Sequence, residues 1–177
     1  MPSSRRQLLL AGLALPLAAG TPTAAAAARG GDAGIVTAAL DLERHAVTTY
    51  EQLLARGLIE PGLGERLRDH ERRHVSGLER ALEGMGRETP AGSGRPAQVP
   101  GLARALAGGR RAAVRFALEL EGRLVAGYFA AQGELENPRL LLPLASIMAS
   151  EGQHLALLRR ELGLDPIPSA FERGTQR

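Results

Sequence analysis

The chain has 177 residues, of which 44% are hydrophobic and only 3% aromatic, a length that suits one domain with a sizeable buried core. It contains no cysteine, which excludes disulfide bonds, thiolate zinc sites and iron–sulfur clusters. The net charge is +3, but acidic residues are interleaved with the arginines, so we expect no nucleic-acid partner.

Residues 1–28 have the organisation of an export signal. Arg5 and Arg6 precede an apolar run at 8–19, and an alanine-rich stretch at 24–28 follows. The run is shorter than the roughly 20 residues that a transmembrane helix needs, so we expect no stable membrane span once the signal is removed. The arginine pair, with serine before it and leucines after it, resembles a twin-arginine signal, and an ordinary secretory leader is the alternative. The sequence therefore predicts an exported protein, located in the periplasm, the cell envelope or the medium.

The rest of the chain predicts helices, because alanine, leucine, glutamate and arginine dominate it. After a short linker at 29–34, apolar residues recur at helical spacing in four segments, 35–56, 63–85, 102–135 and 138–162. We expect Gly108 and Gly109 to fray or kink the start of the third helix. Asn137 is suited to cap the fourth helix, with Pro138 at its first position.

The connections between these helices are short, long and short. Residues 57–62 form a brief turn, whereas 86–101 is crowded with proline, glycine and serine and has no apolar period. Two antiparallel hairpins joined by a crossover along the length of a bundle would account for this order. The expected fold is an all-α four-helix bundle at 35–162, followed by an irregular tail at 163–177.

The first and third predicted helices share a sequence pattern. LDLERHAVTTY ends at Tyr50, and LELEGRLVAGY ends at Tyr128. In each copy a glutamate, Glu43 or Glu121, falls on the apolar face two helical turns before the tyrosine. A buried, unpaired carboxylate costs several kcal/mol or takes up a proton, so both positions require a positive partner.

The second and fourth predicted helices each carry Glu-x-x-His on the apolar face, as ERRH and EGQH. A helix places such a pair side by side. Four carboxylates balance two divalent cations, and carboxylate oxygens with one imidazole nitrogen per metal suit iron or manganese. One glutamate from each of two helices and Glu-x-x-His from the other two is a pattern of di-metal carboxylate centres in bundle cores. We therefore predict six ligands for two iron or manganese ions: Glu43, Glu71, His74, Glu121, Glu151 and His154.

The glutamates of the repeated pattern have an alternative explanation. Glu43 and Glu121 would also be accommodated by buried salt bridges to arginine. Arg115 and Arg123 do not fall on the same stripe, which weakens that explanation. A single Glu-x-x-His is common on solvated helix faces, so the prediction depends on all four helices together.

Two tyrosines and two further histidines lie near the predicted ligands. Tyr50 and Tyr128 either fill the core, with a hydroxyl that needs a partner, or donate hydrogen bonds to a ligand carboxylate. His45 points to another side of its helix, which favours a surface or subunit contact over ligation. His70 lies one turn before His74 and approaches the mouth of the predicted site, but we expect it in solvent.

The order of the six residues resembles that of the ferritin-like superfamily, which includes bacterioferritins, rubrerythrin-type peroxidases and manganese catalases. The resemblance covers 35–162, and the tyrosine after the first glutamate is similar to one that the superfamily keeps near its metals. It implies a ferritin-like bundle with two bridging ligands, Glu71 and Glu151, two terminal ligands, Glu43 and Glu121, and one histidine for each metal, His74 and His154.

The resemblance implies redox chemistry, with metal ions and oxygen or peroxide as partners. Ferroxidase, peroxidase and catalase activities share this ligand set, and the absence of cysteine excludes a complete rubrerythrin. The alternative is no enzyme: a metal-binding, iron-storage or structural bundle of the cell envelope. Against a storage cage, we find no further helix after residue 162 and no acid-rich inner face. Helix faces rich in glycine and alanine leave a homo-oligomer open.

Overall fold

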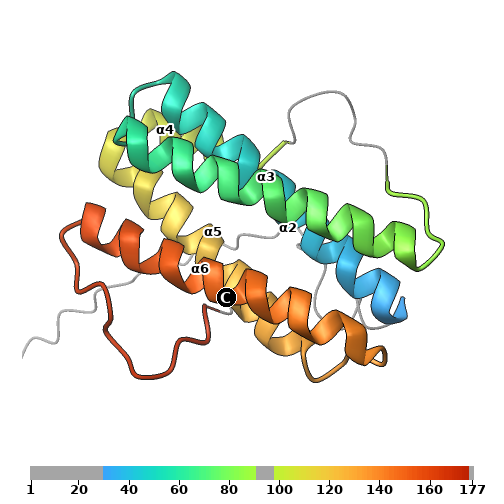
Figure 1. The fold of residues 1–177 in the computed structure, drawn as a ribbon. Coiled ribbons are helices and arrows are strands. Elements are labelled where there is room, and N and C mark those ends of the chain that lie inside the picture. Colours follow the sequence, from blue (N-terminus) through green and yellow to red (C-terminus); the bar gives the residue numbers. More distant parts are fainter. Residues whose placement is uncertain (1–29, 91–97, 176–177) are drawn as a thin grey trace, which may run out of the picture.

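The computed structural model describes residues 30–90 and 98–175 (Figure 1). The predicted export signal lies outside these residues, so export stays a prediction. The elements, in chain order, are α2 (Gly31–Ala55), α3 (Pro61–Gly84), α4 (Leu102–Ala107), α5 (Gly109–Ala131), the 3-10 helix η1 (Pro138–Leu140) and α6 (Leu141–Glu161). No strand occurs in the described part of the chain. None of the described helices combines the length and apolar character that crossing a membrane requires.

The four long helices form two hairpins, as predicted. α2 packs along α3 and α5 along α6, and the hairpins meet mainly through α2 and α5 and much less through α3 and α6 (Figure 1). Residues 85–101 connect the two hairpins, and 91–97 of this connection are outside the described residues. The predicted all-α bundle of two hairpins is confirmed.

Two helices begin earlier than the sequence indicated. α2 starts at Gly31, four residues before the predicted start, because the Asp32 carboxylate accepts hydrogen bonds from the backbone N–H groups of Glu136 and Asn137, at 2.9 and 2.8 Å. α3 starts at Pro61 because the Glu60 carboxylate accepts from the first free N–H groups of that helix. The Asp32 contact ties α2 to the turn between α5 and α6, a distant part of the sequence.

The predicted kink in the third helix is a break. Gly109 has a φ of +77°, which divides the predicted helix into α4 and α5. α5 then ends at Ala131, four residues before the predicted end. Asn137 caps the next element as predicted, accepting from the Arg139 N–H at 3.1 Å, but the first turn is the 3-10 helix η1 rather than α-helix.

The core between the hairpins is built from leucines, with one or more from each long helix. Those with exposed fractions of 1% or less include Leu40, Leu53, Leu67, Leu78, Leu82, Leu124, Leu144 and Leu158. This apolar core is continuous along the bundle, so any polar side chain buried in it requires a partner. Seven polar or charged side chains are buried among the described residues, and five of them are predicted metal ligands.

The described part of the tail after α6, residues 163–175, is irregular and folds back onto α5 (Figure 1). The Thr175 N–H donates to the Gly122 carbonyl at 2.8 Å, and the Arg173 guanidinium lies over the Phe129 ring, 5.6 Å from its centre. A Cβ at Gly174 would lie 2.1 Å from the Gly122 oxygen, so only glycine allows this approach. The tail therefore covers α5 next to Glu121.

Candidate metal centre

Four carboxylates meet in the interior of the bundle, one from each long helix. They belong to Glu43 on α2, Glu71 on α3, Glu121 on α5 and Glu151 on α6, and none is more than 1% exposed. Their helices form where the apolar spacing predicted helices, and each glutamate lies among the buried core-facing residues of its helix. The predicted burial of all four is therefore confirmed.

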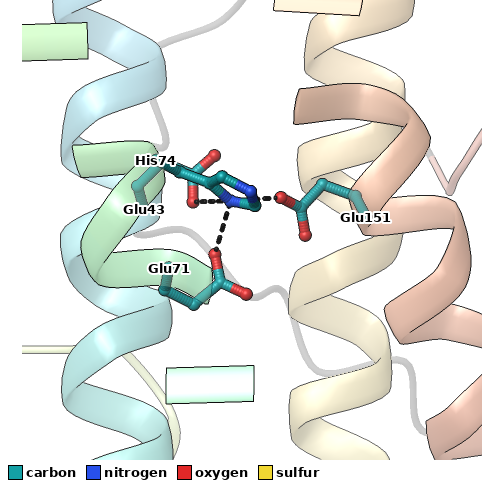
Figure 2. Close-up of side chains that lie close together, drawn as sticks. All are labelled: Glu43, Glu71, His74 and Glu151. Carbon is teal, nitrogen blue, oxygen red and sulfur yellow. Dashed lines mark hydrogen bonds and ion pairs between the residues drawn. The ribbon is translucent and has the colours of Figure 1, made fainter. Parts of the chain in front are cut away.

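The first group of side chains surrounds His74 (Figure 2). Its Nδ1 atom lies 2.8 Å from Glu151 Oε1, 3.3 Å from Glu71 Oε2 and 3.5 Å from Glu43 Oε2. Figure 2 shows Glu43 and Glu71 on one side of the ring and Glu151 approaching from the opposite helix. The potential ligand atoms of this group all lie within 4.8 Å of one another.

The second group surrounds His154 in the same way. Its Nδ1 atom lies 2.9 Å from both Glu71 Oε1 and Glu151 Oε2 and 3.6 Å from Glu121 Oε2. Glu71 and Glu151 belong to both groups, and each turns one oxygen toward each histidine. All six side chains that the sequence singled out thus lie in one cluster with two shared members.

The hydrogen-bonding needs of this cluster are not met by the described residues. Six of its buried atoms have no hydrogen-bond partner there: Glu43 Oε2, Glu71 Oε1, Glu121 Oε2, both carboxylate oxygens of Glu151, and His154 Nδ1. A proton on a ring nitrogen points to one acceptor, so three oxygens around each Nδ1 cannot all be satisfied. Unpaired buried polar groups cost about 1–3 kcal/mol each, more when charged. Two cations among these atoms would satisfy them, and the oxygen and nitrogen donors fit iron or manganese.

Arginine does not neutralise the cluster. Within residues 30–90 and 98–175, no ion pair joins Glu43 or Glu121 to an arginine. The arginines instead pair with partly exposed acids, as Arg72 does with Glu51 at 2.7 Å. The alternative of buried arginine salt bridges therefore finds no support in the structure.

When no cation is bound, protons on the glutamates and histidines of the cluster offset the negative charge of its carboxylates. Burial raises the pKa of Glu43 well above its ordinary value, and burial together with the Glu121 charge raises the pKa of Glu151 to about 8. Burial alone would lower the pKa of both histidines, but the surrounding carboxylates outweigh it and raise that of His74 to about 12 and that of His154 further. Burial also acts to raise the pKa of Glu121, but contact with His154 holds it below its ordinary value. Cations entering the cluster must displace these protons.

The two tyrosines donate crossed hydrogen bonds to the cluster. The Tyr50 hydroxyl on α2 donates to Glu121 Oε1 on α5, and the Tyr128 hydroxyl on α5 donates to Glu43 Oε1 on α2 at 2.5 Å. This pairing requires α2 and α5 to run antiparallel. Burial and the neighbouring carboxylate charges raise both tyrosine pKa values well above 10, so both hydroxyls keep their protons. The two tyrosines thus fill the core and also donate to carboxylates of the cluster, whereas an effect on bound metal stays a prediction.

Tyr128→Phe should destabilise the metal-free protein by about 1–3 kcal/mol, because it leaves Glu43 Oε1 without a donor in the core. Urea unfolding of chelator-treated protein, followed by circular dichroism, measures this loss. Thr49→Val is the matched control: the Thr49 hydroxyl is also buried, but it donates only to the His45 carbonyl of its own helix. An equal loss in both variants would contradict a special role for the tyrosine.

The expectation that His70 lies in solvent is wrong. His70 is partly buried, and its Nδ1 atom lies 3.0 Å from Nε2 of His154, with the two ring centres 5.3 Å apart. Ser150, which the sequence did not single out, is also near, with Oγ 3.4 Å from the same nitrogen. His45 is absent from both groups, as expected, and its proposed surface or subunit contact stays a prediction.

The comparisons with other proteins agree with this geometry. The model of the ferritin-like domain family matches residues 31–164. No curated protein matches the chain. Among solved structures, the fold is similar to that of a conserved hypothetical protein from Mycobacterium tuberculosis, with a TM-score of 0.61 and 20% sequence identity over 84% of this chain and 99% of that one. At this identity the likeness speaks for the fold alone.

Proposed function

We propose that this chain, which belongs to the ferritin-like domain family, is an exported protein that binds two iron or manganese ions between its four helices. The observation that carries the proposal is the double use of Glu71 and Glu151, each of which offers one oxygen to each group. A cluster that held a single cation would need only one such group. Two groups with two shared carboxylates suit a pair of neighbouring ions.

The proposed roles of the six residues follow from this sharing. Glu71 and Glu151 bridge the ions, Glu43 and His74 complete one half, and Glu121 and His154 complete the other. The unpaired atoms of the cluster support these roles, because all six belong to the contacts that come together around Nδ1 of His74 and Nδ1 of His154. The two tyrosines hold the outer oxygens of Glu43 and Glu121, which fixes the direction of the oxygens that remain free.

The bound ions would supply redox chemistry, with ferrous ion, oxygen or peroxide as substrates. The bundle would exclude water, because the four glutamates and His154 are at most 1% exposed. His74 is the most accessible of the six, with 12% of its side chain exposed, and it lies on α3. Small substrates would therefore reach the centre beside His74.

A binding function without turnover is the second candidate. The burial of five of the six side chains favours tight retention of the ions over exchange. A metal-holding or structural bundle of the cell envelope would need the same residues, and only turnover distinguishes it from an oxidoreductase.

Metal analysis and oxygen consumption test the proposal. Protein recovered from the exported fraction of its host cells should contain close to two iron or manganese ions per chain, and it should consume oxygen on addition of ferrous ion or decompose peroxide. Metal without either activity would support the binding function. Neither iron nor manganese in the purified protein would overturn the metal centre, and recovery only from the cytoplasm would overturn export.

A further inference from the structure

The outer nitrogen of His154 has a partner that its counterpart lacks. Nε2 of His154, on the far side of the ring from the carboxylates, lies 3.0 Å from Nδ1 of His70 and 3.4 Å from Oγ of Ser150. In the described part of the chain, no hydrogen bond reaches Nε2 of His74. The rings of His70 and His154 are nearly parallel, with an interplanar angle of 25° and their centres 5.3 Å apart.

The difference comes from one position in an otherwise repeated pattern. Glu71-x-x-His74 and Glu151-x-x-His154 occupy matching places on α3 and α6, but the residue before the glutamate is His70 in one and Ser150 in the other. His70 does not belong to either group of potential ligands, because its near nitrogen faces the outer side of His154. The two halves of the cluster thus have the same kinds of potential ligand, but among the described residues only His154 has a histidine next to its outer nitrogen.

The contact between His70 and His154 matters because a hydrogen-bond partner at Nε2 decides which tautomer a ligating imidazole adopts. A neutral histidine that presents the Nδ1 lone pair to a cation carries its proton on Nε2. An acceptor for that proton fixes the tautomer and the ring orientation and makes the ligating nitrogen more basic. Loss of such an acceptor typically costs about 10–100-fold in metal affinity.

We propose that His70 is a positioning residue that accepts a hydrogen bond from Nε2–H of His154 and thereby makes the half-site of Glu121 and His154 the tighter of the two. The inference rests on the proposed function, since it concerns the same cluster. It implies that the two ions enter one after the other, the first beside His154.

Titration of the metal-free full-length chain with Co²⁺, followed by its visible absorption bands, tests the proposal. The native chain should bind two ions in two steps, and His70→Ala should weaken the tighter step about 10–100-fold while the weaker step stays unchanged. His70→Asn should recover most of the affinity, because its side-chain oxygen replaces the accepting nitrogen. His45→Ala, a histidine outside both groups, should change neither step.

A spectroscopic measurement separates positioning from a general loss of structure. In ¹⁵N-histidine-labelled, Zn²⁺-loaded protein, His154 should show its proton on Nε2, and His70→Ala should shift that signal, whereas His70→Asn should preserve the tautomer. Equal weakening of both steps, or of neither, would overturn the proposal. So would a large effect of Ser150→Ala with none of His70→Ala. A native chain that binds no cobalt, zinc, iron or manganese would overturn the proposed function and this inference together, whereas two equal, His70-independent steps would overturn the inference alone.

Discussion

Glu71→Gln is expected to remove both metal ions, whereas Glu43→Gln should remove only one. Glu71 offers Oε2 to the group around His74 and Oε1 to the group around His154, while Glu43 reaches the His74 group alone. The amide keeps the volume of the side chain but loses the charge and one ligating oxygen. Metal content per chain after desalting, measured by mass spectrometry, should fall from two to none in one variant and from two to one in the other.

The controls for this experiment lie on the same helices. Glu83→Gln changes an exposed glutamate of α3 in the same way and should keep both ions. Glu151→Gln should behave like Glu71→Gln, because Glu151 is the other shared residue. Circular dichroism of the metal-free variant must show that Glu71→Gln still folds, because removing one partner of a buried ion pair costs about 3–5 kcal/mol. A folded Glu71→Gln that retained one ion would contradict the shared role.

The sequence predicted the cluster well because its evidence was local. A glutamate in an apolar stripe must be buried wherever the helix packs, and the i, i+3 spacing sets the histidine beside it whatever the neighbouring helices do. The structure brings Glu43 and Glu121 to the same place as Glu71 and Glu151 because all four stripes face one core. Such features follow from helical geometry alone.

The features that the sequence could not predict depend on contacts between helices. The crossed partners of Tyr50 and Tyr128 are set by the antiparallel register of α2 and α5, which no local pattern contains. His70 was assigned to solvent, although its place one turn before His74 does put it on the same side of α3. Its depth depends on how far α6 stands from α3, and this distance is a property of the bundle. The early start of α2 likewise depends on Asp32 meeting a turn more than a hundred residues away.

Metal-free protein should lose stability as the pH rises. Glu151 has an ordinary pKa of 4.5 and a folded value of about 8, and His74 has 6.5 and about 12. Between these values the folded protein keeps protons that the unfolded chain has released, so the free energy of unfolding falls with pH, by about 1.4 kcal/mol per pH unit for each proton that differs fully. The Glu151 contribution is lost from about pH 5 to 8, and the His74 contribution from about pH 6.5 upward. The direction for Glu43 is the same as for Glu151.

Bound metal should reverse this trend, and chelation should therefore have its largest effect at alkaline pH. The ions bind deprotonated carboxylates and neutral imidazoles, so each pH unit that removes protons from the cluster strengthens binding. At a free metal concentration a thousandfold above Kd, binding at one site raises the free energy of unfolding by about 4 kcal/mol. For a domain of this size, that corresponds to an increase of roughly ten degrees in Tm. Thermal melts with metal and with chelator at pH 6, 7 and 8 should show a Tm difference that widens with pH, and Glu71→Gln should show none. A difference that narrowed with pH, or a chelator that left the Tm of the native chain unchanged, would show that protons and metals do not compete for these six side chains.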